Sequence, residues 1–147
     1  MSERPILLQA DHLKKWFPVR KGVFSKAAQY VKAVDDVSLA IREGETLGIV
    51  GESGCGKSTL ARTMMRLIEP TEGTVLFQGQ DLTSADKESL RRMRRDIQII
   101  FQDPYASLNP RQRVSDILAE PFLIHKLGSR EAAMKRAEEL LDLVGLS

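Results

Sequence analysis

A glycine-rich stretch in the first half of the chain has the spacing of a phosphate-binding loop. Residues 51–59 read Gly-Glu-Ser-Gly-Cys-Gly-Lys-Ser-Thr, which fits the pattern G-x-x-x-x-G-K-[ST] at each fixed position. The apolar run 45–50 before the loop predicts a buried strand, and the helical pattern 60–68 after it stops at Glu69-Pro70. A strand, a glycine loop and a helix in this order are the arrangement that a bound polyphosphate requires.

The chemistry expected of this loop is nucleotide binding. Glycines let the backbone curl without Cβ atoms in the way, so that successive N–H groups point at phosphate oxygens near a helix N-terminus. We expect Lys57 to bridge the β- and γ-phosphates of ATP, Ser58 to hold Mg²⁺ and Thr59 to contact the α-phosphate. The predicted cofactor-binding residues of the loop are Gly51, Glu52, Ser53, Gly54, Cys55, Gly56, Lys57, Ser58 and Thr59. A glycine-rich turn without a ligand is the alternative, and the flanking elements favour the nucleotide.

The composition indicates an ordinary globular chain. At 147 residues it is long enough for one domain with a core, with 42% apolar and 29% charged residues. A net charge of +2 does not suggest a protein that coats nucleic acid. The single cysteine, Cys55, excludes an internal disulfide and fits a reducing compartment. No apolar run reaches membrane-spanning length. If the protein acts at a membrane, we expect it to do so from the cytoplasmic side, through a partner protein.

The remaining pattern predicts an α/β fold with a small antiparallel layer ahead of a parallel core. The predicted strands outside the loop unit are 6–17, 31–41, 74–78 and 97–101. The predicted later helices are 84–95 with Ser84 as its cap, 114–120 halted at Pro121, and a last helix that starts at Ser129 and stops at Gly145. The apolar stripe expected on this last helix is Ala133, Ala137, Leu140, Leu141 and Val144.

Four stretches together resemble the ATP-binding subunits of ABC transporters, specifically the dipeptide/oligopeptide importer group and in particular the second ATPase subunits of the dipeptide importers. They are residues 13–19, 50–58, 77–82 and 100–110. The loop alone is shared by many families. The last stretch, Ile-Phe-Gln-Asp-Pro-Tyr-Ala-Ser-Leu-Asn-Pro, is much more specific.

The resemblance assigns roles outside the loop. Gln102 matches the glutamine that contacts Mg²⁺ and the attacking water, so with Lys57 it is a predicted catalytic residue, and with Ser58 a predicted metal ligand. Phe17 matches the aromatic residue that stacks on adenine, and its neighbours Trp16 and Tyr30 remain alternatives for that position. The segment 105–121 matches the region where a groove receives a short helix of the transmembrane partner.

The resemblance also implies the fold: a P-loop NTPase core of the ABC type with an N-terminal antiparallel β layer and the start of a helical subdomain. We expect residues 1–102 to form the β layer and core, and residues 103–147 to begin the helical subdomain. The family's Ser-Gly-Gly-Gln signature, its Asp-ending strand, its general-base Glu and its switch His are not found in residues 1–147. The resemblance therefore implies the N-terminal part of such an ATPase, with exposed apolar strand edges, weak ATP binding and no useful hydrolysis by this part alone.

The function implied is ATP-driven uptake of dipeptides or oligopeptides. The implied partners are transmembrane permease subunits, a second ATPase subunit and a substrate-binding protein, with the protein peripheral on the cytoplasmic face of the membrane and without nucleic acid. Three rival hypotheses stay open. They are a nucleic-acid-linked ABC ATPase, suggested by the arginine-rich residues 91–95; a phosphate-loop kinase or GTPase; and a stand-alone nucleotide-binding module.

Overall fold

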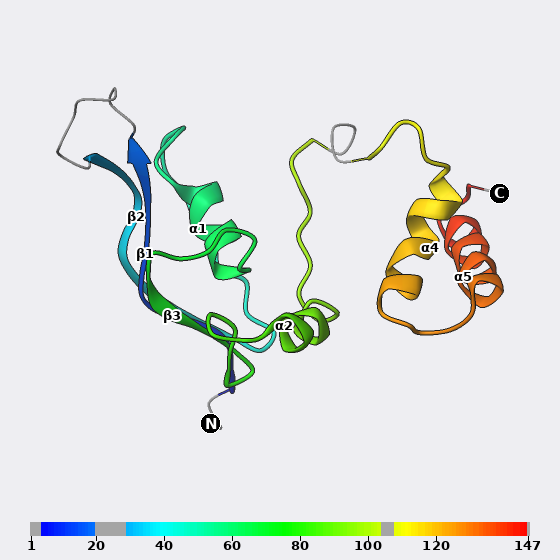
Figure 1. The fold of residues 1–147 in the computed structure, drawn as a ribbon, viewed down its shortest axis with the longest axis horizontal. Coiled ribbons are helices and arrows are strands. Elements are labelled where there is room, and N and C mark those ends of the chain that lie inside the picture. The colour runs from blue at the N-terminus through cyan, green and yellow to red at the C-terminus, as the bar shows by residue number, and fades with distance from the viewer. Residues whose placement is uncertain (1–3, 20–28, 104–107, 147) are drawn as a thin grey trace. The chain divides into compact units, whose positions relative to one another are not determined.

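The chain forms two compact units, Met1–Met93 and Arg94–Ser147, in a computed structural model that describes residues 4–19, 29–103 and 108–146 (Figure 1). Residues 94–103 form no helix or strand. The division near residue 102 into a core and the start of a helical subdomain stays a prediction.

The first unit is built on a four-stranded antiparallel sheet with the order β2-β1-β3-β4. Its strands are β1 (Ile6–Val19), β2 (Gln29–Arg42), β3 (Glu72–Phe77) and the short β4 (Gln80–Asp81). β1 pairs with both β2 and β3, so the N-terminal segment lies in the interior of the sheet. The predicted antiparallel β layer is confirmed, and β1 and β2 are each longer than expected.

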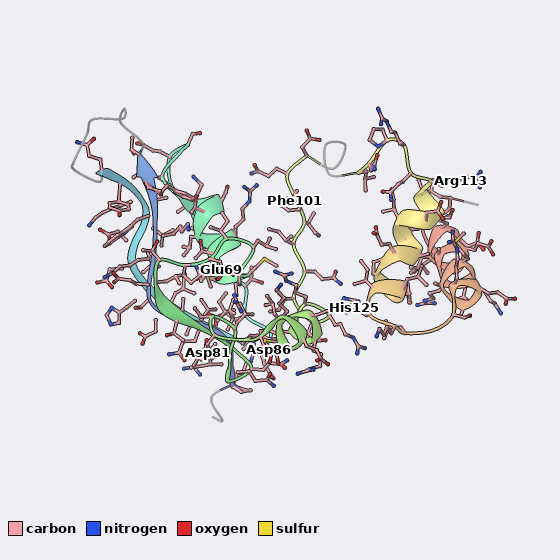
Figure 2. All side chains as sticks on the ribbon, viewed as in Figure 1. Glu69, Asp81, Asp86, Phe101, Arg113 and His125 are labelled. Atoms are coloured by element: carbon pink, nitrogen blue, oxygen red, sulfur yellow. The ribbon has the colours of Figure 1, made fainter. Side chains whose placement is uncertain are left out.

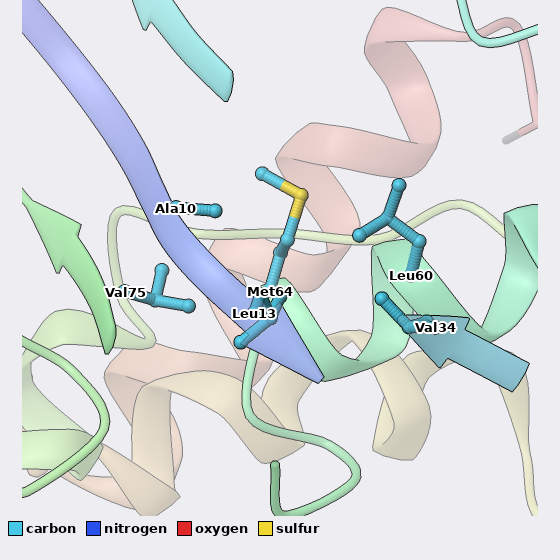
Figure 3. Packing of buried hydrophobic residues seen from close by; sticks show 6 residues of the cluster. All are labelled: Ala10, Leu13, Val34, Leu60, Met64 and Val75. Carbon is cyan, nitrogen blue, oxygen red and sulfur yellow. The ribbon is translucent and has the colours of Figure 1, made fainter. Parts of the chain in front are cut away.

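Helix α1 (Lys57–Met64) packs on one face of this sheet. The core between them consists of Ala10, Leu13, Val34, Leu60, Met64 and Val75, which are all buried (Figure 3). Leu13 is fully enclosed, and burial of one such side chain contributes roughly 1.5–3 kcal/mol. This apolar contact fixes the helix that follows the phosphate loop against β1 and β2.

The pairing of β1 with β2 is interrupted by four register shifts, of which two bear on the site and on the residues near it. Lys15 pairs with Val34 whereas Trp16 pairs with Lys32, which leaves Ala33 as an extra residue in β2. Further along the ladder, His12 and Asp36 both have positive φ, 46° and 60°, and His12 Nδ1 lies 2.7 Å from Asp36 Oδ1. The bulge at Ala33 places Lys32 on the face opposite to Val34, which packs against α1.

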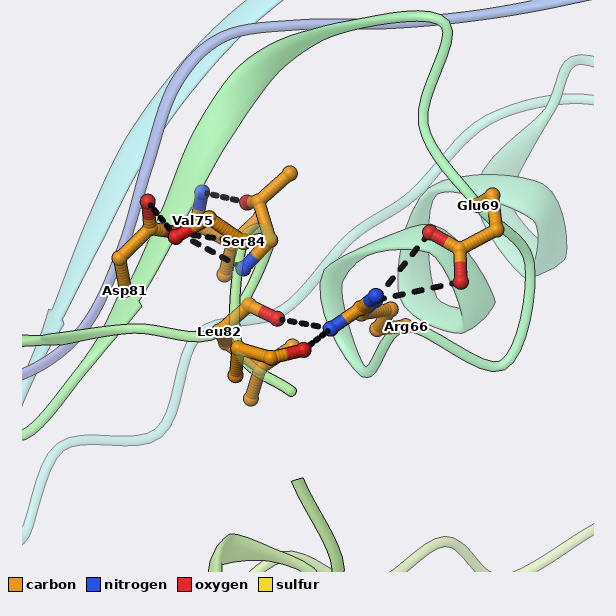
Figure 4. A network of polar contacts seen from close by, with 8 residues as sticks. Arg66, Glu69, Val75, Asp81, Leu82 and Ser84 are labelled. Atoms are coloured by element: carbon orange, nitrogen blue, oxygen red, sulfur yellow. Dashed lines mark hydrogen bonds and ion pairs between the residues drawn. The ribbon is translucent and has the colours of Figure 1, made fainter. Parts of the chain in front are cut away.

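Helix α1 ends earlier than the predicted residue 68, because Arg66 has a φ of 48° and cannot continue it. The Arg66 guanidinium donates hydrogen bonds to the carbonyls of Leu82 and Ala85 and forms an ion pair with Glu69 (Figure 4). Its side chain is only 17% exposed, so these bonds are partly shielded from water. Arg66 therefore ties the end of α1 to the turn that follows β4.

The predicted Ser84 cap of the next helix is wrong. Helix α2 spans Lys87–Met93, and the carboxylate of Asp86 accepts hydrogen bonds from the backbone N–H groups of Glu88 and Ser89 at 2.9 and 2.8 Å. Ser84 donates its hydroxyl proton to Asp81 instead, at 2.6 Å, and this hydrogen bond is the main reason why the pKa of Asp81 is lowered. A carboxylate nearer the helix took the capping position.

The second unit contains an antiparallel pair of helices, α4 (Val114–Ile124) and α5 (Arg130–Leu143), whose contact is formed by buried Ala119, Ala133 and Ala137. The prediction that α4 halts at Pro121 is wrong: the helix continues to Ile124, and the N–H of the next residue, His125, donates to the carbonyl of Pro121 (Figure 2). A proline inside a helix removes one N–H hydrogen bond and crowds the carbonyl four residues earlier, and packing against α5 outweighs these costs.

The ends of α5 follow the sequence prediction. The Ser129 hydroxyl accepts from the N–H of Ala132 at 3.2 Å, and Gly145 follows the helix with a φ of 75°. Within the predicted apolar stripe, Ala133 and Ala137 are buried, but Val144 is 67% exposed. Leu140 and Leu141 are half-buried, so the stripe extends into the last turn and ends before Val144.

Two apolar segments predicted as buried strands do not form strands. Residues 45–50 and 97–101 pair with no other strand in the described parts of the chain. Val50 is 93% exposed and Ile100 is 97% exposed, while Phe101 also reaches solvent (Figure 2). A strand requires a neighbour to accept its ladder hydrogen bonds, and neither segment finds one here. The apolar side chains of these segments are exposed, but without strands here the expectation of exposed apolar strand edges stays a prediction.

We predict that Gly73→Ala destabilises the sheet by about 2 kcal/mol or more. Gly73 has a φ of 89°, and an added Cβ would lie 2.4 Å from the carbonyl oxygen of His12 in β1. The matched control is Gly79→Ala, at a φ of 75° with no atom within 4 Å, which should cost about 1 kcal/mol. Denaturant unfolding followed by the fluorescence of the single tryptophan measures both variants; equal losses would contradict the role of the close contact.

We predict that the pKa of His12 lies above its ordinary value of 6.5, mainly because of its hydrogen bond to Asp36. The folded chain then holds this proton more tightly than the unfolded chain. The pair therefore contributes stability that is fully present below pH 6.5 and is lost as the pH rises through the folded pKa. An NMR titration of the His12 ring measures the midpoint. Asp36→Asn should lower it and Asp11→Asn should lower it less, and an unchanged midpoint in Asp36→Asn would refute the assignment.

Candidate nucleotide-binding site

The phosphate loop leads directly into α1. Gly56 is the N-cap residue of the helix, with a φ of 99° and no side chain to cap the first turn. The backbone N–H groups of Gly54, Gly56, Lys57 and Ser58 donate to no acceptor within the described residues. These four N–H groups are thus donors gathered at a helix N-terminus, where the dipole favours an anion.

The loop rests on the backbone of β2. A Cβ added to Gly56 would lie 2.1 Å from the carbonyl oxygen of Ala33, the extra residue of the β2 bulge. Behind the loop, the N–H of Leu60 donates to the carbonyl of Gly56 at 2.8 Å. The bulge and the first turn of α1 therefore hold the loop from two sides, and only glycine fits at position 56.

The ammonium group of Lys57 lies over the loop itself. Its Nζ donates to the carbonyl oxygens of Gly51 and Glu52 at 2.7 and 2.6 Å, and it lies 3.5 Å from Cys55 Sγ. A Cβ on Gly51 would meet Cys55 Sγ at 2.8 Å, so the thiol fills the space beside the loop backbone. The structure thus brings together the predicted loop residues, with a cation at their centre.

The other chemistry-bearing loop residues lie on the first turn of α1. Ser58 is exposed, and Thr59 is half-buried with its carbonyl oxygen accepting from the Thr63 hydroxyl at 2.7 Å. No group of three or more His, Cys, Asp or Glu side chains that could hold a metal occurs among the residues described. A hard cation here would therefore rely on neutral oxygens such as the Ser58 hydroxyl together with oxygens of the ligand, which is the usual mode for Mg²⁺ beside phosphates.

The three aromatic candidates for the base lie on opposite faces of the hairpin. The Trp16 ring lies near the ammonium groups of Lys14 and Lys32, at 5.6 and 4.6 Å, and 6.3 Å from the Tyr30 ring. Phe17 lies under the ammonium of Lys15 at 5.0 Å.

Strand pairing identifies the face of each ring. Lys15 pairs with Val34, a core residue packed against α1, and paired residues share a face. Phe17, two residues further along β1, is therefore on the α1 side, whereas Trp16 and Tyr30 point away from it.

Gln102 is not brought to the loop by what the structure describes. It is exposed and belongs to the second unit, so its proximity to Lys57 stays a prediction.

Of the predicted permease-binding segment, residues 105–107 lie outside the described residues. In the arginine-rich stretch, Arg92 is paired with Glu88 at 3.2 Å and bonded to Ser89 at 2.9 Å, as in an ordinary solvated helix face.

Two residues near the site were missed by sequence reasoning. Ala33 has an inconspicuous side chain, and its carbonyl became important only through the bulge. Lys15 could have been found, because its spacing of two residues from Phe17 places both side chains on one face of a strand.

A glycine loop of this geometry, ahead of a helix that packs on a sheet, defines a phosphate-loop nucleotide-binding domain. The chain belongs to the ABC transporter family, whose family model matches residues 34–147.

Among curated proteins, the chain is similar to ATP-binding subunits of importers. It is 52% identical over 146 residues to the oligopeptide transport ATP-binding protein AppF of Bacillus subtilis (strain 168). This alignment covers 99% of this chain and 44% of AppF. It is 46% identical over 140 residues to the di/tripeptide transport ATP-binding protein DppF of Pseudomonas aeruginosa (strain UCBPP-PA14), covering 95% of this chain and 43% of DppF. The chain thus spans less than half the length of these relatives. The resemblance to the peptide importer group is confirmed.

Among solved structures, the chain is similar to the ATP-binding cassette MJ0796, in a dimeric post-hydrolysis state bound to ADP and Pi. The TM-score is 0.73 at 29% identity, covering 95% of this chain and 58% of the cassette. The predicted ABC-type fold is confirmed. In the described part of the chain, no helix combines the length and the apolar character needed to cross a membrane.

We predict that Gly56→Ala lifts the loop from β2, because the new Cβ would overlap the Ala33 carbonyl and the φ of 99° disfavours alanine. Amide exchange at Leu60, whose N–H is bonded to Gly56, should then accelerate by about tenfold or more, the effect of at least 1.4 kcal/mol. Gly54→Ala is the control, since its Cβ would meet no atom within 4 Å at a similar φ of 79°. Equal exchange in both variants would contradict the contact with β2.

Proposed function

We propose that this chain is the nucleotide-binding part of an ATPase subunit that drives peptide uptake through a membrane permease. The observation that carries the proposal is the loop: backbone donors at the start of α1, seated on β2 with the Lys57 ammonium at their centre. Family membership and the similarity to oligopeptide and di/tripeptide transport ATP-binding proteins support the transport role.

Different residues of the loop are proposed to contact different phosphates of ATP. The N–H groups of Gly54, Gly56, Lys57 and Ser58 would donate to phosphate oxygens, and the Lys57 ammonium would exchange its carbonyl partners for the β- and γ-phosphates. Bound Mg²⁺ supplies charge neutralisation at the phosphates. The Ser58 hydroxyl and Gln102 are the chain's own candidates to hold it, and Gln102 would also orient the attacking water. Thr59 contacts the α-phosphate.

Phe17 is the proposed base-stacking residue. Its ring lies on the face of β1 that α1 covers and is 37% exposed, so a planar base can stack on it. Trp16 and Tyr30 are on the other face, with Trp16 Nε1 donating to Asp35 at 3.0 Å, which makes them less suitable. Stacking fixes the adenine end while the loop fixes the phosphate end.

The assembly proposed is that of an importer. A second ATPase subunit completes each nucleotide site, permease subunits receive the motion, and a substrate-binding protein delivers the peptide. The site would then work on the cytoplasmic face of the membrane, where ATP is available. Relatives named for oligopeptides, for di- and tripeptides and for glutathione support a small peptide as cargo.

We predict that Lys57→Ala weakens ATP binding by the intact gene product about 10- to 100-fold, the usual worth of a charge-assisted hydrogen bond. It should also abolish ATP-driven peptide uptake. Lys14→Ala is the matched control, because Lys14 is paired with Glu72 at 2.7 Å and does not line the cavity beside the loop, so its loss should change neither quantity. Calorimetric titration with ATP measures the affinity. ATP binding of equal strength in Lys57→Ala and in the parent protein would rule out this site.

A further inference from the structure

Strands β1 and β2 carry three lysines, of which only one lacks a carboxylate partner in the part of the chain that the structure describes. Lys14 is paired with Glu72 at 2.7 Å, and Lys32 with Asp35 at 3.1 Å. Lys15 forms no hydrogen bond or ion pair with any described residue, and its ammonium rests on the Phe17 ring at 5.0 Å from the centroid. Its positive charge is therefore not neutralised by the described residues around it.

This lysine is on the side of the sheet where the phosphate loop lies. Lys15 pairs with Val34, which packs against Leu60 of α1, and the residue next to Val34 is Ala33, whose carbonyl supports Gly56. The two paired lysines are near Trp16, on the opposite face. The unneutralised ammonium is thus on the same face of the sheet as α1 and the loop, and it rests on Phe17.

We propose that Lys15 is a further nucleotide-contacting residue, which binds the α-phosphate of a nucleotide whose base stacks on Phe17. The inference rests on the proposed function, since it requires a nucleotide in this site. One face of the Phe17 ring is covered by the ammonium, which leaves the other face for the base. The ribose then carries the α-phosphate within reach of the lysine side chain.

The chemistry favours transfer of the ammonium from the ring to a phosphate. A cation–π contact at an exposed site is weak, and a phosphate oxygen offers both a full charge and a hydrogen-bond acceptor. Lys57, at the centre of the loop, serves the β- and γ-phosphates, so the two lysines act at opposite ends of the polyphosphate. Lys15 would therefore discriminate nucleotides from nucleosides.

The test measures binding of ATP, AMP and adenosine to the intact gene product by NMR titration or calorimetry. Lys15→Met removes the charge but keeps the length of the side chain, and it should weaken ATP and AMP about fivefold, as expected of an ion pair at a partly exposed site. Adenosine, which has no phosphate, should bind unchanged. Lys15→Arg should retain most of the affinity. Lys14→Met, on the opposite face, should change none of the three ligands.

Two results would overturn the role of Lys15 and leave the proposed function standing. One is unchanged AMP and ATP binding in Lys15→Met. The other is an equal loss for adenosine, because the lysine would then act only through the Phe17 ring. A parent protein that binds no ATP would overturn both the role of Lys15 and the proposed function. An equal effect of Lys14→Met would show general electrostatic attraction and would also overturn the specific contact.

Discussion

The contact between Gly56 and the carbonyl of Ala33 is the constraint on which the site depends. It brings the backbone of the phosphate loop against the backbone of β2, so closely that a single added carbon would lie 2.1 Å from the oxygen. The N-terminus of α1 is consequently fixed relative to the sheet by backbone groups, which move less than side chains. Donors held in this way need little rearrangement when they meet an anion.

The same bulge determines what surrounds the loop. Ala33 is an extra residue in β2, because the pairing passes from Lys15–Val34 to Trp16–Lys32. Because of this extra residue, Lys32 lies with Trp16 on the outer face, although Val34, two residues away, is in the core. Alternation along β1 places Lys15 and Phe17 on the side of α1. The bulge therefore seats the loop, and together with the alternation in β1 it separates the residues suited to a nucleotide from those that stabilise the outer face of the sheet.

Local patterns predicted the elements whose partners lie within the described chain. The alternation in β1 and β2, the glycine loop and the Ser129 cap each depend on nearby residues, and each formed as expected. The run ending at Val50 failed because a buried strand needs hydrogen-bonding neighbours on both sides, which no local pattern supplies. Pro121 failed differently, because packing between helices outweighed a local stop signal. Within the site, the loop could be predicted from its motif, whereas the role of Ala33 depends on a bulge that the sequence does not reveal.

The most direct test of the account is the chemical shift of individual backbone amides in the ¹⁵N-labelled intact gene product during titration with Mg²⁺ and ATP. The account predicts the largest changes at Gly54, Gly56, Lys57 and Ser58, whose N–H groups have no acceptor in the described chain, with small changes along the outer edge at β4. Saturable changes centred on any other surface, with these four amides unaffected, would contradict the assignment of this loop as the nucleotide site.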